Sequence, residues 1–231
     1  MVIALVVSGG KGVRMGTDIP KQFLELDGIP VLMRTLSKFE QVPEVDEIVL
    51  VLPEAYFSYY DTMEHKPQKP VTLVAAGHER QDSVRNGLLK VKEIDPGSIV
   101  LIHDGVRPFV TEKTISEGIS HTRHYGAAAC GVHPKDTIKM MGTTGYSEKT
   151  LDRDRCLLIH TPQCFYTKNI LEAHEKIKEL DKFVTDDTMV YEEYFGPVYL
   201  YEDEYTNIKI TTTEDLLLAE LILSKEKHSQ C

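Results

Sequence analysis

Short runs of β-branched and aliphatic residues alternate with longer amphipathic stretches along most of the chain. The apolar runs have the length of buried strands, whereas the amphipathic stretches repeat apolar positions with helical spacing. The predicted strands are residues 3–7, 47–52, 71–75, 98–103, 127–132 and 198–201. The predicted helices are residues 31–39, 79–91, 111–123, 168–179, 186–194 and 213–224. This order predicts an α/β fold, with a mostly parallel sheet and helices on both of its faces.

One segment, at about residues 135–155, breaks this alternation. Residues 137–141 and 149–152 have strand character and flank the glycine-rich turn Gly142-Thr-Thr-Gly145, a pattern typical of a β-hairpin. The segment is too long and too polar to be a simple crossover connection. We therefore expect a single domain over residues 1–231, with a protruding hairpin arm at about residues 135–155.

Composition and charge narrow the classes of protein and partner. Hydrophobic residues make up 42% and charged residues 27% of the 231 residues, a balance typical of globular proteins. No apolar run reaches the length of a membrane span, and the first residues lack the pattern of a signal peptide, so we expect a cytoplasmic protein. The formal net charge of −10 argues against nucleic acid or a membrane surface as a partner. A bound anion would need a focused pocket.

The first candidate site is the glycine-rich segment after the first predicted strand, Ser8-Gly-Gly-Lys-Gly-Val-Arg-Met-Gly16. Ligands of open α/β sheets bind beyond the carboxyl ends of the strands, and glycines let backbone N–H groups approach a phosphate closely. Lys11, Arg14 and Lys21 add positive charge to the segment. The pattern predicts a triphosphate-binding loop, with a purely structural glycine turn as the alternative.

Two common nucleotide-binding motifs do not fit this loop. A Walker A loop would end in Gly-Lys followed by Ser or Thr, and the segment has no such ending. The dinucleotide fingerprint needs a third glycine at the position of Met15. The second mismatch also argues against a nicotinamide-dependent oxidoreductase.

A second candidate site follows the strand predicted at residues 98–103. Asp104 lies at the carboxyl end of that strand, where a carboxylate can hold Mg²⁺ against phosphate oxygens; a turn cap is the alternative. Side chains alternate between the two faces of a strand, so His103 should point away from the face of Asp104. We expect His103 to pack or to make hydrogen bonds rather than to act as a base.

Seven short motifs are spread from about residue 3 to residue 223. They are Gly9-Gly10-x-Gly12-x-Arg14-Met15 with Pro20-Lys21-Gln22-Phe23, Gly77-x-Glu79-Arg80-x-x-Ser83-Val84, His103-Asp104-Gly-Val-Arg107-Pro108-Phe109, Pro134-Lys135-Asp136-Thr137-Ile-Lys139, Thr150-Leu-Asp-Arg153 with Thr161-Pro162-Gln163-x-Phe165, Thr185-Asp186-Asp187, and Asn207-Ile208-Lys209-Ile210-Thr211. These motifs and their order along the chain resemble those of the polyol-phosphate cytidylyltransferases, a branch of the nucleotide-sugar pyrophosphorylase fold. The resemblance implies a Rossmann-like fold of the nucleotide-diphospho-sugar transferase type.

The resemblance also implies an activity, the transfer of CMP from CTP to a small polyol phosphate with release of pyrophosphate. One branch of the family uses 2-C-methyl-D-erythritol 4-phosphate, in isoprenoid precursor synthesis by the non-mevalonate pathway. Its sister branch uses ribitol 5-phosphate and makes CDP-ribitol. The motifs at 135–137 and 185–187 look more like the first branch, which we expect, with the second as the alternative. A non-catalytic nucleotide-binding module is a remote alternative, because it would keep the glycine loop but would need none of Asp104, Lys21 and Lys209.

Individual roles follow from the same resemblance. It implies catalytic cations at Arg14, Lys21 and Lys209, a nucleotide site at Ser8, Gly9, Gly10, Gly12, Gly77 and Ser83, acceptor contacts at Arg107, Thr137, Arg153 and Thr185, and Asp104 as the ligand of Mg²⁺ or another divalent cation. It further implies a homodimer joined through the hairpin arm. Taken alone, Lys209 could equally be an exposed lysine. Some relatives carry an Asp where this chain has Thr206, which puts a second metal carboxylate in question.

Overall fold

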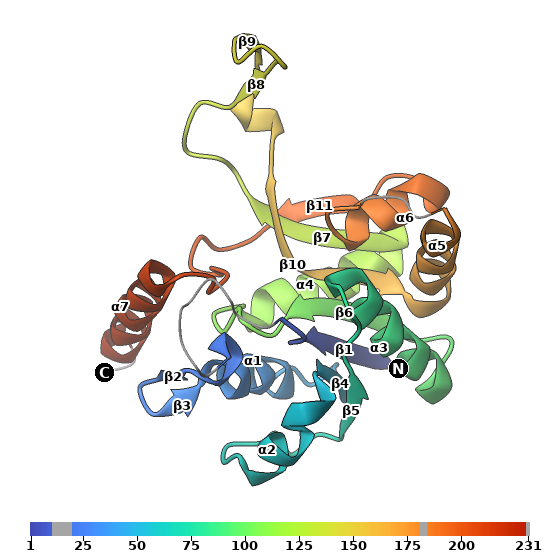
Figure 1. Ribbon diagram of the computed structural model, residues 1–231, viewed down its shortest axis with the longest axis vertical. Helices are drawn as coiled ribbons and strands as arrows, with labels where there is room; N and C mark the ends of the chain where they lie inside the picture. Colours follow the sequence, from blue (N-terminus) through green and yellow to red (C-terminus); the bar gives the residue numbers. More distant parts are fainter. Residues whose placement is uncertain (11–19, 181–183, 230–231) are drawn as a thin grey trace.

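The computed structural model describes residues 1–10, 20–180 and 184–229 and is built on a seven-stranded sheet (Figure 1). The strand order is β11-β7-β10-β6-β1-β4-β5. Strand β10 runs antiparallel to both of its neighbours, whereas the other neighbouring strands are parallel. The strands are β1 (Val2–Val7), β4 (Glu47–Leu52), β5 (Val71–Ala75), β6 (Ile99–Asp104), β7 (Ala127–Val132), β10 (Leu158–Tyr166) and β11 (Tyr199–Glu202). The predicted mostly parallel α/β fold is confirmed.

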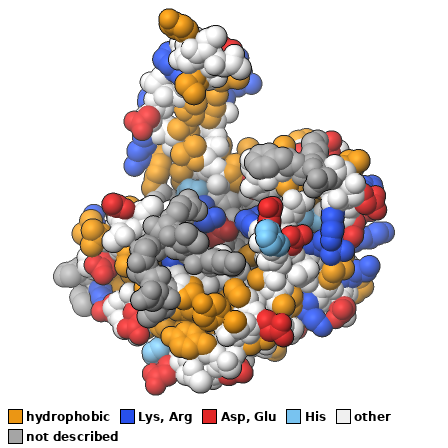
Figure 2. All heavy atoms as spheres, viewed as in Figure 1, with side chains coloured by type: hydrophobic (Ala, Val, Ile, Leu, Met, Phe, Trp, Pro, Cys, Tyr) orange, Lys and Arg blue, Asp and Glu red, His pale blue; other side chains and the backbone are white. Residues whose placement is uncertain are grey.

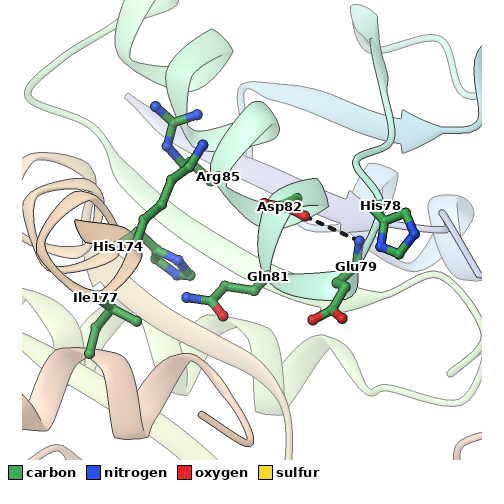
Figure 3. Close-up of a pocket in the computed structure, with 8 residues that line it drawn as sticks. His78, Glu79, Gln81, Asp82, Arg85, His174 and Ile177 are labelled. Carbon is green, nitrogen blue, oxygen red and sulfur yellow. Dashed lines mark hydrogen bonds between the residues drawn. The ribbon is translucent and has the colours of Figure 1, made fainter. Parts of the chain in front are cut away.

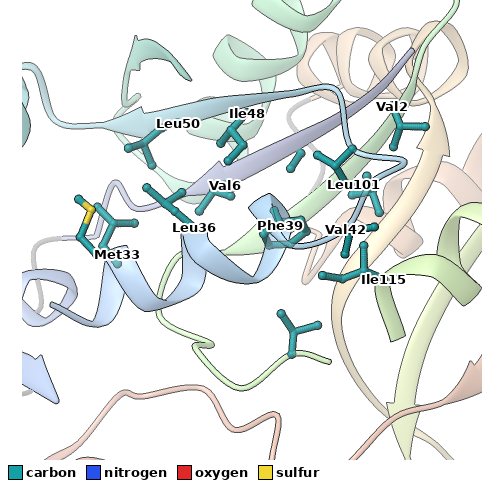
Figure 4. Packing of buried hydrophobic residues seen from close by; sticks show 14 of the residues in the cluster. Val2, Val6, Met33, Leu36, Phe39, Val42, Ile48, Leu50, Leu101 and Ile115 are labelled. Carbon is teal, nitrogen blue, oxygen red and sulfur yellow. The ribbon is translucent and has the colours of Figure 1, made fainter. Parts of the chain in front are cut away.

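Helices cover both faces of this sheet. Helices α1 (Val31–Glu40) and α4 (Glu112–Tyr125) pack on one face, and α3 (Arg80–Ile94), α5 (Thr167–Glu179) and α6 (Asp187–Phe195) pack on the other. Alternate residues of β1 enter the two hydrophobic clusters, as the pleat of a strand requires. Figure 4 shows the first cluster, in which Leu36 and Phe39 of α1 lie against the sheet.

The remaining elements are short or lie at the edges. They are β2 (Glu25–Leu26), β3 (Ile29–Pro30), α2 (Phe57–Thr62), α7 (Thr213–Ser229) and the 3-10 turns η2 (Lys21–Phe23), η3 (Glu54–Tyr56) and η4 (Arg153–Arg155). Helix α7 packs beside β2 through Ala219, Ile222 and Leu223. None of the described helices has the length and apolar character that crossing a membrane requires.

The predicted hairpin is present between β7 and β10. Strands β8 (Lys139–Met141) and β9 (Ser147–Thr150) pair antiparallel, and every residue of both is exposed. The hairpin stands at the end of an arm that projects away from the sheet (Figure 1). Strand β8 is shorter than the predicted segment at 137–141, and β9 begins two residues before the predicted segment at 149–152, because the chain pairs near the turn.

Within the seven-stranded sheet, β10 is the strand that the hydrophobic pattern did not predict. It carries polar side chains at Thr161 and Gln163 and a proline at position 162, which has no N–H for a strand ladder. The pairing with β7 shifts in register between Ile159 and Gln163, around that proline. The strand is nevertheless central, since it separates β6 from β7.

Candidate active site

The candidate site lies where β1 and β6 end side by side. In the register of this parallel pair Val7 stands opposite Asp104, so Ser8 and Asp104 leave the sheet at the same edge. After β1 the chain connects to β4, which pairs with one side of β1, whereas β6 pairs with the other side of β1. A crevice between strands whose connections diverge in this way is the usual ligand site of an open α/β sheet.

The segment after β1 is held tightly against the start of α3. A side chain at Gly9 would place its Cβ 2.8 Å from Ala76 Cβ and 3.0 Å from Ser83 Oγ, so this approach requires glycine. The backbone N–H of Gly77 donates to Ser83 Oγ over 3.0 Å. A Cβ at Gly77 would come within 2.2 Å of Asp82 Cβ. Two segments that are far apart in the sequence therefore meet at this crevice.

The structure thus brings Ser8, Gly9, Gly77 and Ser83 together, as expected of one nucleotide site. Ser8 is 5% exposed, and its Oγ has no hydrogen-bond partner among the residues described. Gly10, the residue after Gly9, has no atom within 4 Å of the position that a Cβ would occupy. A buried hydroxyl that lacks a partner is costly unless a ligand supplies one.

Two predicted site residues, Gly12 and Arg14, lie outside the described residues. Their roles stay predictions, and so does the contribution of Lys11 to the positive charge of the loop. The loop re-enters the described chain at Pro20, followed by η2. The side-chain amide of Gln22 donates to Ser8 O over 3.1 Å and so ties η2 to the end of β1.

Three cations surround the carboxylate of Asp104. Lys209 Nζ lies 3.0 Å and Arg107 Nε 3.3 Å from Asp104 Oδ2, and Arg80 Nε lies 3.5 Å from Oδ1. We refer to these four residues as the Asp104 cluster. Burial opposes the charge of Asp104, but Arg80, Lys209 and Arg107 outweigh it and hold the pKa of the carboxyl well below its usual range. The cluster therefore has one permanent negative charge against three positive ones.

Lys21, from the motif that follows the glycine loop, contacts the chain directly after Lys209. Its Nζ donates to Ile210 O over 3.0 Å, one residue beyond Lys209. The structure thereby places the turn after the glycine loop next to the chain that carries Lys209. Both lysines were predicted as catalytic cations, and they lie on neighbouring segments although they are 188 positions apart in the sequence.

The chain before Lys209 is fixed by Asn207. Its side-chain amide donates to Thr161 O over 3.0 Å and to Asp203 Oδ2 over 2.7 Å. Its backbone carbonyl accepts from Arg107 over 2.8 Å. Asn207 is fully buried, so it anchors the segment while Lys209, with a side chain 37% exposed, reaches the crevice.

His103 lies on the other side of β6 from Asp104, as the strand alternation predicted. It is fully buried, and its ring nitrogens make contacts of 3.0 Å with Thr161 Oγ1 and 3.2 Å with Arg107 O. Burial lowers the pKa of His103 to about 4, so the ring is neutral at physiological pH. The expectation that His103 packs or makes hydrogen bonds is confirmed.

The four predicted acceptor residues divide into two groups. Arg107 belongs to the Asp104 cluster, and Thr185 is exposed just before α6. Thr137 and Arg153 instead lie on the arm, which projects from the sheet (Figure 1). The Arg153 side chain is 55% exposed and donates to Lys135 O over 2.8 Å.

Arg80 is the contact of Asp104 that the sequence interpretation left without a role. It is the first residue of α3, directly after the Glu79 N-cap, and a cation at that end opposes the helix dipole. This misplaced charge was the signal in the sequence. The structure explains why a cation stands at this end of α3: Arg80 pairs with Asp187 Oδ2 at 2.9 Å as well as with Asp104.

The metal-binding capacity of the described residues is small. They include no group of three or more His, Cys, Asp and Glu side chains arranged to hold a metal ion. Thr206, at the position where a second carboxylate was in question, is exposed. A divalent cation at Asp104 would thus need most of its ligands from a bound molecule, which is how Mg²⁺ commonly binds with nucleotide phosphates.

Comparison with known proteins gives one consistent family. The model of the IspD family, 2-C-methyl-D-erythritol 4-phosphate cytidylyltransferase, matches residues 2–225. The chain is 49% identical over 223 residues to the protein of that name from Clostridium botulinum (strain Okra / Type B1), covering 96% of both chains. It is 44% identical over 228 residues to the one from Clostridium acetobutylicum, covering 97% of this chain and 98% of the relative.

Solved structures agree with the sequence relatives. The 4-diphosphocytidyl-2C-methyl-D-erythritol synthase of Anaerococcus prevotii DSM 20548 superposes with a TM-score of 0.86 at 34% identity, with 96% of each chain covered. The 2-C-methyl-D-erythritol 4-phosphate cytidylyltransferase of Francisella tularensis superposes with a TM-score of 0.79 at 28% identity, over 95% of this chain and 98% of that one. The chain therefore belongs to the 2-C-methyl-D-erythritol 4-phosphate cytidylyltransferase family.

Proposed function

We propose that the protein transfers CMP from CTP to 2-C-methyl-D-erythritol 4-phosphate, forming 4-diphosphocytidyl-2-C-methyl-D-erythritol and pyrophosphate in isoprenoid precursor synthesis. The observation that carries the proposal is the Asp104 cluster, which lies at the end of β6 beside the glycine segment that follows β1. The names of the relatives supply the substrates.

The reaction needs no general base from the protein. The second pKa of a phosphate monoester is about 6, so the acceptor phosphate is already largely ionised at neutral pH. One of its oxygens forms a new bond to the α-phosphorus of CTP, and the bond from that phosphorus to the bridging oxygen breaks as pyrophosphate leaves. The difficulty is electrostatic, because one anion must approach another.

Lys21 and Lys209 are suited to reduce that repulsion. Lys209 Nζ lies in the Asp104 cluster, and Lys21 Nζ contacts the carbonyl of the residue after Lys209. Cations that face the developing charge stabilise the transition state. We assign Arg14 to the same task on its sequence motif alone.

The nucleotide would lie across the crevice between the end of β1 and the start of α3. Ser8, Gly9, Gly10 and Gly12 would follow the triphosphate, and Gly77 and Ser83 would hold the base and the ribose. The tight approach of Gly9 to Ser83 and the unpartnered Oγ of Ser8 support this arrangement.

We propose that Mg²⁺ or another divalent cation binds between Asp104 and the phosphates of CTP. One buried carboxylate at a strand end, beside a phosphate site, fits the oxygen ligands that Mg²⁺ prefers. The metal would supply neutralisation of phosphate charge. Both oxygens of Asp104 contact cations in the structure, so one of these contacts would give way, and the long stem of Lys209 lets it turn toward the phosphates.

We also propose that the active form is a homodimer joined through the arm. Met140, Met141 and Tyr146 are 47%, 77% and 80% exposed, and Figure 2 shows hydrophobic side chains along the arm. A two-stranded hairpin is marginally stable by itself in water. Packing against a second copy would cover these apolar side chains.

In such a dimer the acceptor site is shared between subunits. Arg107 and Thr185 of one subunit would face the acceptor together with the partner subunit's Thr137 and the partner subunit's Arg153. An arginine fork can grip a phosphate with two hydrogen bonds. The partner subunit's Arg153 and the partner subunit's Thr137 would grip the acceptor phosphate together with Lys209 and Thr185, without selecting the polyol. Selection would come from the polyol end of the acceptor, near Asp104, Arg107 and Thr185.

The experiment that tests the activity measures pyrophosphate release with CTP and two acceptors. We expect kcat/KM at saturating CTP to be higher for 2-C-methyl-D-erythritol 4-phosphate than for ribitol 5-phosphate. An apolar contact with the methyl group contributes only about 1–3 kcal/mol, so exclusion of the longer ribitol chain should contribute more through its unmatched hydroxyl. A preference for ribitol 5-phosphate would assign the chain to the sister activity, and no turnover with either acceptor would refute the proposal.

A mixed dimer tests the shared acceptor site. An Arg153→Ala subunit has an intact body and a defective arm, and a Lys21→Ala subunit has the reverse. Pairing the two leaves one complete site in each mixed dimer, so statistical mixing should restore about a quarter of wild-type activity. If each arm served its own subunit, mixing would restore none, and a fully active monomer in sedimentation would exclude the dimer.

A further inference from the structure

A buried line of contacts connects helix α5 to the Asp104 cluster. It begins at His174, whose ring is 1% exposed and whose Nε2 lies 3.1 Å from Asp187 Oδ1. The other oxygen of Asp187 accepts from Arg80 over 2.9 Å, and Arg80 Nε lies 3.5 Å from Asp104. Two residues, Asp187 and Arg80, therefore separate His174 from the carboxylate of the candidate active site.

The ionisation state of Asp187 determines which ring nitrogen of His174 carries the hydrogen. Burial disfavours the charge of Asp187, but Arg80 and the hydrogen bond from His174 outweigh burial and keep the pKa of the carboxyl below its usual value. An ionised carboxylate only accepts hydrogen bonds, so Nε2 of His174 carries the hydrogen. Asp187 has each oxygen engaged by one partner, and its orientation is set by both.

Arg80 and His174 both restrain the side chain of Asp187, whereas Gln163 restrains its backbone. Gln163 Oε1 accepts from the backbone N–H of Asp187 over 3.0 Å and holds the start of α6. The terminal torsion of an aspartate is broad, so a backbone anchor leaves the carboxylate free to rotate. The hydrogen bond from His174 removes that freedom and aims Oδ2 at Arg80.

We propose that His174 is a positioning residue that, through Asp187, holds Arg80 against Asp104 for the CMP transfer proposed above, on which this inference rests. His174 is remote from the proposed reacting atoms. It acts by keeping the guanidinium of Arg80 in one orientation, so that Asp104 presents a fixed carboxylate to the site. A small misplacement of a catalytic group is enough to lower the rate strongly.

The far side of His174 gives experimental access to this line. Its Nδ1 has no hydrogen-bond partner in the part of the chain that the structure describes. His174 borders a pocket of about 370 Å³, together with Gln81 and Ile177 (Figure 3). A small molecule from solvent can therefore reach the place of the imidazole when the side chain is shortened.

The first test compares two substitutions of similar size. His174→Leu removes the N–H donor, whereas the amide of His174→Gln can still donate to Asp187. We expect kcat of the Leu variant to fall on the order of tenfold to a hundredfold and the Gln variant to recover most of it. Gln81→Ala, which lines the same pocket outside the line of contacts, should keep wild-type kcat. Equal losses in the Leu and Gln variants would indicate a packing role and overturn the proposal.

Chemical rescue separates the hydrogen bond from the filling of space. In His174→Ala, added imidazole should restore kcat in a saturable manner, whereas thiophene, a five-membered ring without an N–H, should not. Rescue by both compounds, or by neither in a variant that circular dichroism shows to be folded, would contradict the proposal. This test also serves if the Leu variant does not fold.

A double variant tests whether the effect passes through Arg80. If it does, Arg80→Gln combined with His174→Leu should lose no more kcat than Arg80→Gln alone. Multiplying losses would show that His174 acts by another route. An active wild type with an unaffected His174→Leu variant would remove the inference and leave the proposed function intact, whereas a wild type without CMP transfer would remove the proposed function itself.

Discussion

Replacing Asp104 by Asn tests the electrostatic account of the site directly. The substitution keeps the shape of the side chain and removes its negative charge. Arg107, Arg80 and Lys209 then face one another around a neutral amide whose NH₂ group cannot accept from them. We expect the variant to fold, to lose CMP transfer and to be less stable than the wild type.

The size of the destabilisation follows from burial. Removing one partner of a buried ion pair costs about 3–5 kcal/mol. The side chains of Asp104 and Arg107 are 9% and 10% exposed, whereas those of Arg80 and Lys209 are 33% and 37% exposed. Water screens part of the interaction with the two more exposed cations, so we expect the lower end, about 3 kcal/mol. For a chain of this length the corresponding loss in Tm is roughly 6–12 °C.

The pH dependence of the free energy of unfolding tests the contribution of Asp104 independently. The pKa of Asp104 is lowered in the folded protein, so its contribution to stability is complete above the ordinary Asp pKa of about 3.9 and is lost as the pH falls further. The wild type and the Asn variant should therefore differ most at neutral pH. Their free energies of unfolding should converge as the pH falls below about 4.

Urea denaturation at pH 7 measures the difference, with Asp61→Asn as a control at an exposed aspartate. Pyrophosphate should stabilise the Asp104→Asn variant more than the wild type, because the anion replaces the missing negative charge among the cations. If the variant unfolds at the same urea concentration and with the same slope as the wild type, Asp104 does not hold the cations together and the account is wrong.

Three further predictions concern other parts of the site. Lys21→Ala should lower kcat by about 10²–10³-fold with a smaller effect on CTP binding, and steady-state kinetics with near wild-type kcat would refute its role. Gly77→Ala should raise KM for CTP on the order of tenfold or more, since its Cβ would meet Asp82 Cβ at 2.2 Å, whereas Gly97→Ala, with its nearest atom 3.5 Å away, should not. Burial lowers the pKa of His103 from 6.5 to about 4. Neutral His103 should therefore contribute about 3 kcal/mol to the free energy of unfolding above pH 6.5, and this contribution should be lost as the pH falls toward 4. The loss should be absent in His103→Gln.

The hydrophobic pattern predicted the strands that are buried and parallel. Strands β4 and β7 have the predicted bounds, because their residues are almost all buried and apolar. Strand β5 also has the predicted bounds, although it lies at the edge of the sheet and is only partly buried. Strand β10 escaped the pattern for physical reasons. Gln163 is polar because its side chain holds the start of α6, and Pro162 lies where the pairing with β7 is irregular.

The position of the candidate site was predictable because it depends on where strands end. Asp104 and the glycine segment both follow buried strands, and parallel neighbours bring their carboxyl ends to one edge. The connection of Arg80 to Asp187 was not predictable in the same way. It joins residues 107 positions apart through side-chain orientation, which neither hydrophobic period nor motif spacing encodes.

The charge arrangement suggests how the site avoids holding its substrates too strongly. Within the described residues Asp104 contacts Arg80, Arg107 and Lys209, so an incoming phosphate must compete with a carboxylate that already occupies them. This competition weakens binding of the substrate ground state. Charge on the leaving pyrophosphate increases as the reaction proceeds, and the cations then gain more from the phosphate oxygens than from Asp104. Interactions that strengthen toward the transition state raise kcat, whereas equally strong binding of the ground state would not. In the mechanism proposed above, the carboxylate at the end of β6 would therefore keep the cations assembled before substrates bind and would reserve part of their attraction for the chemical step.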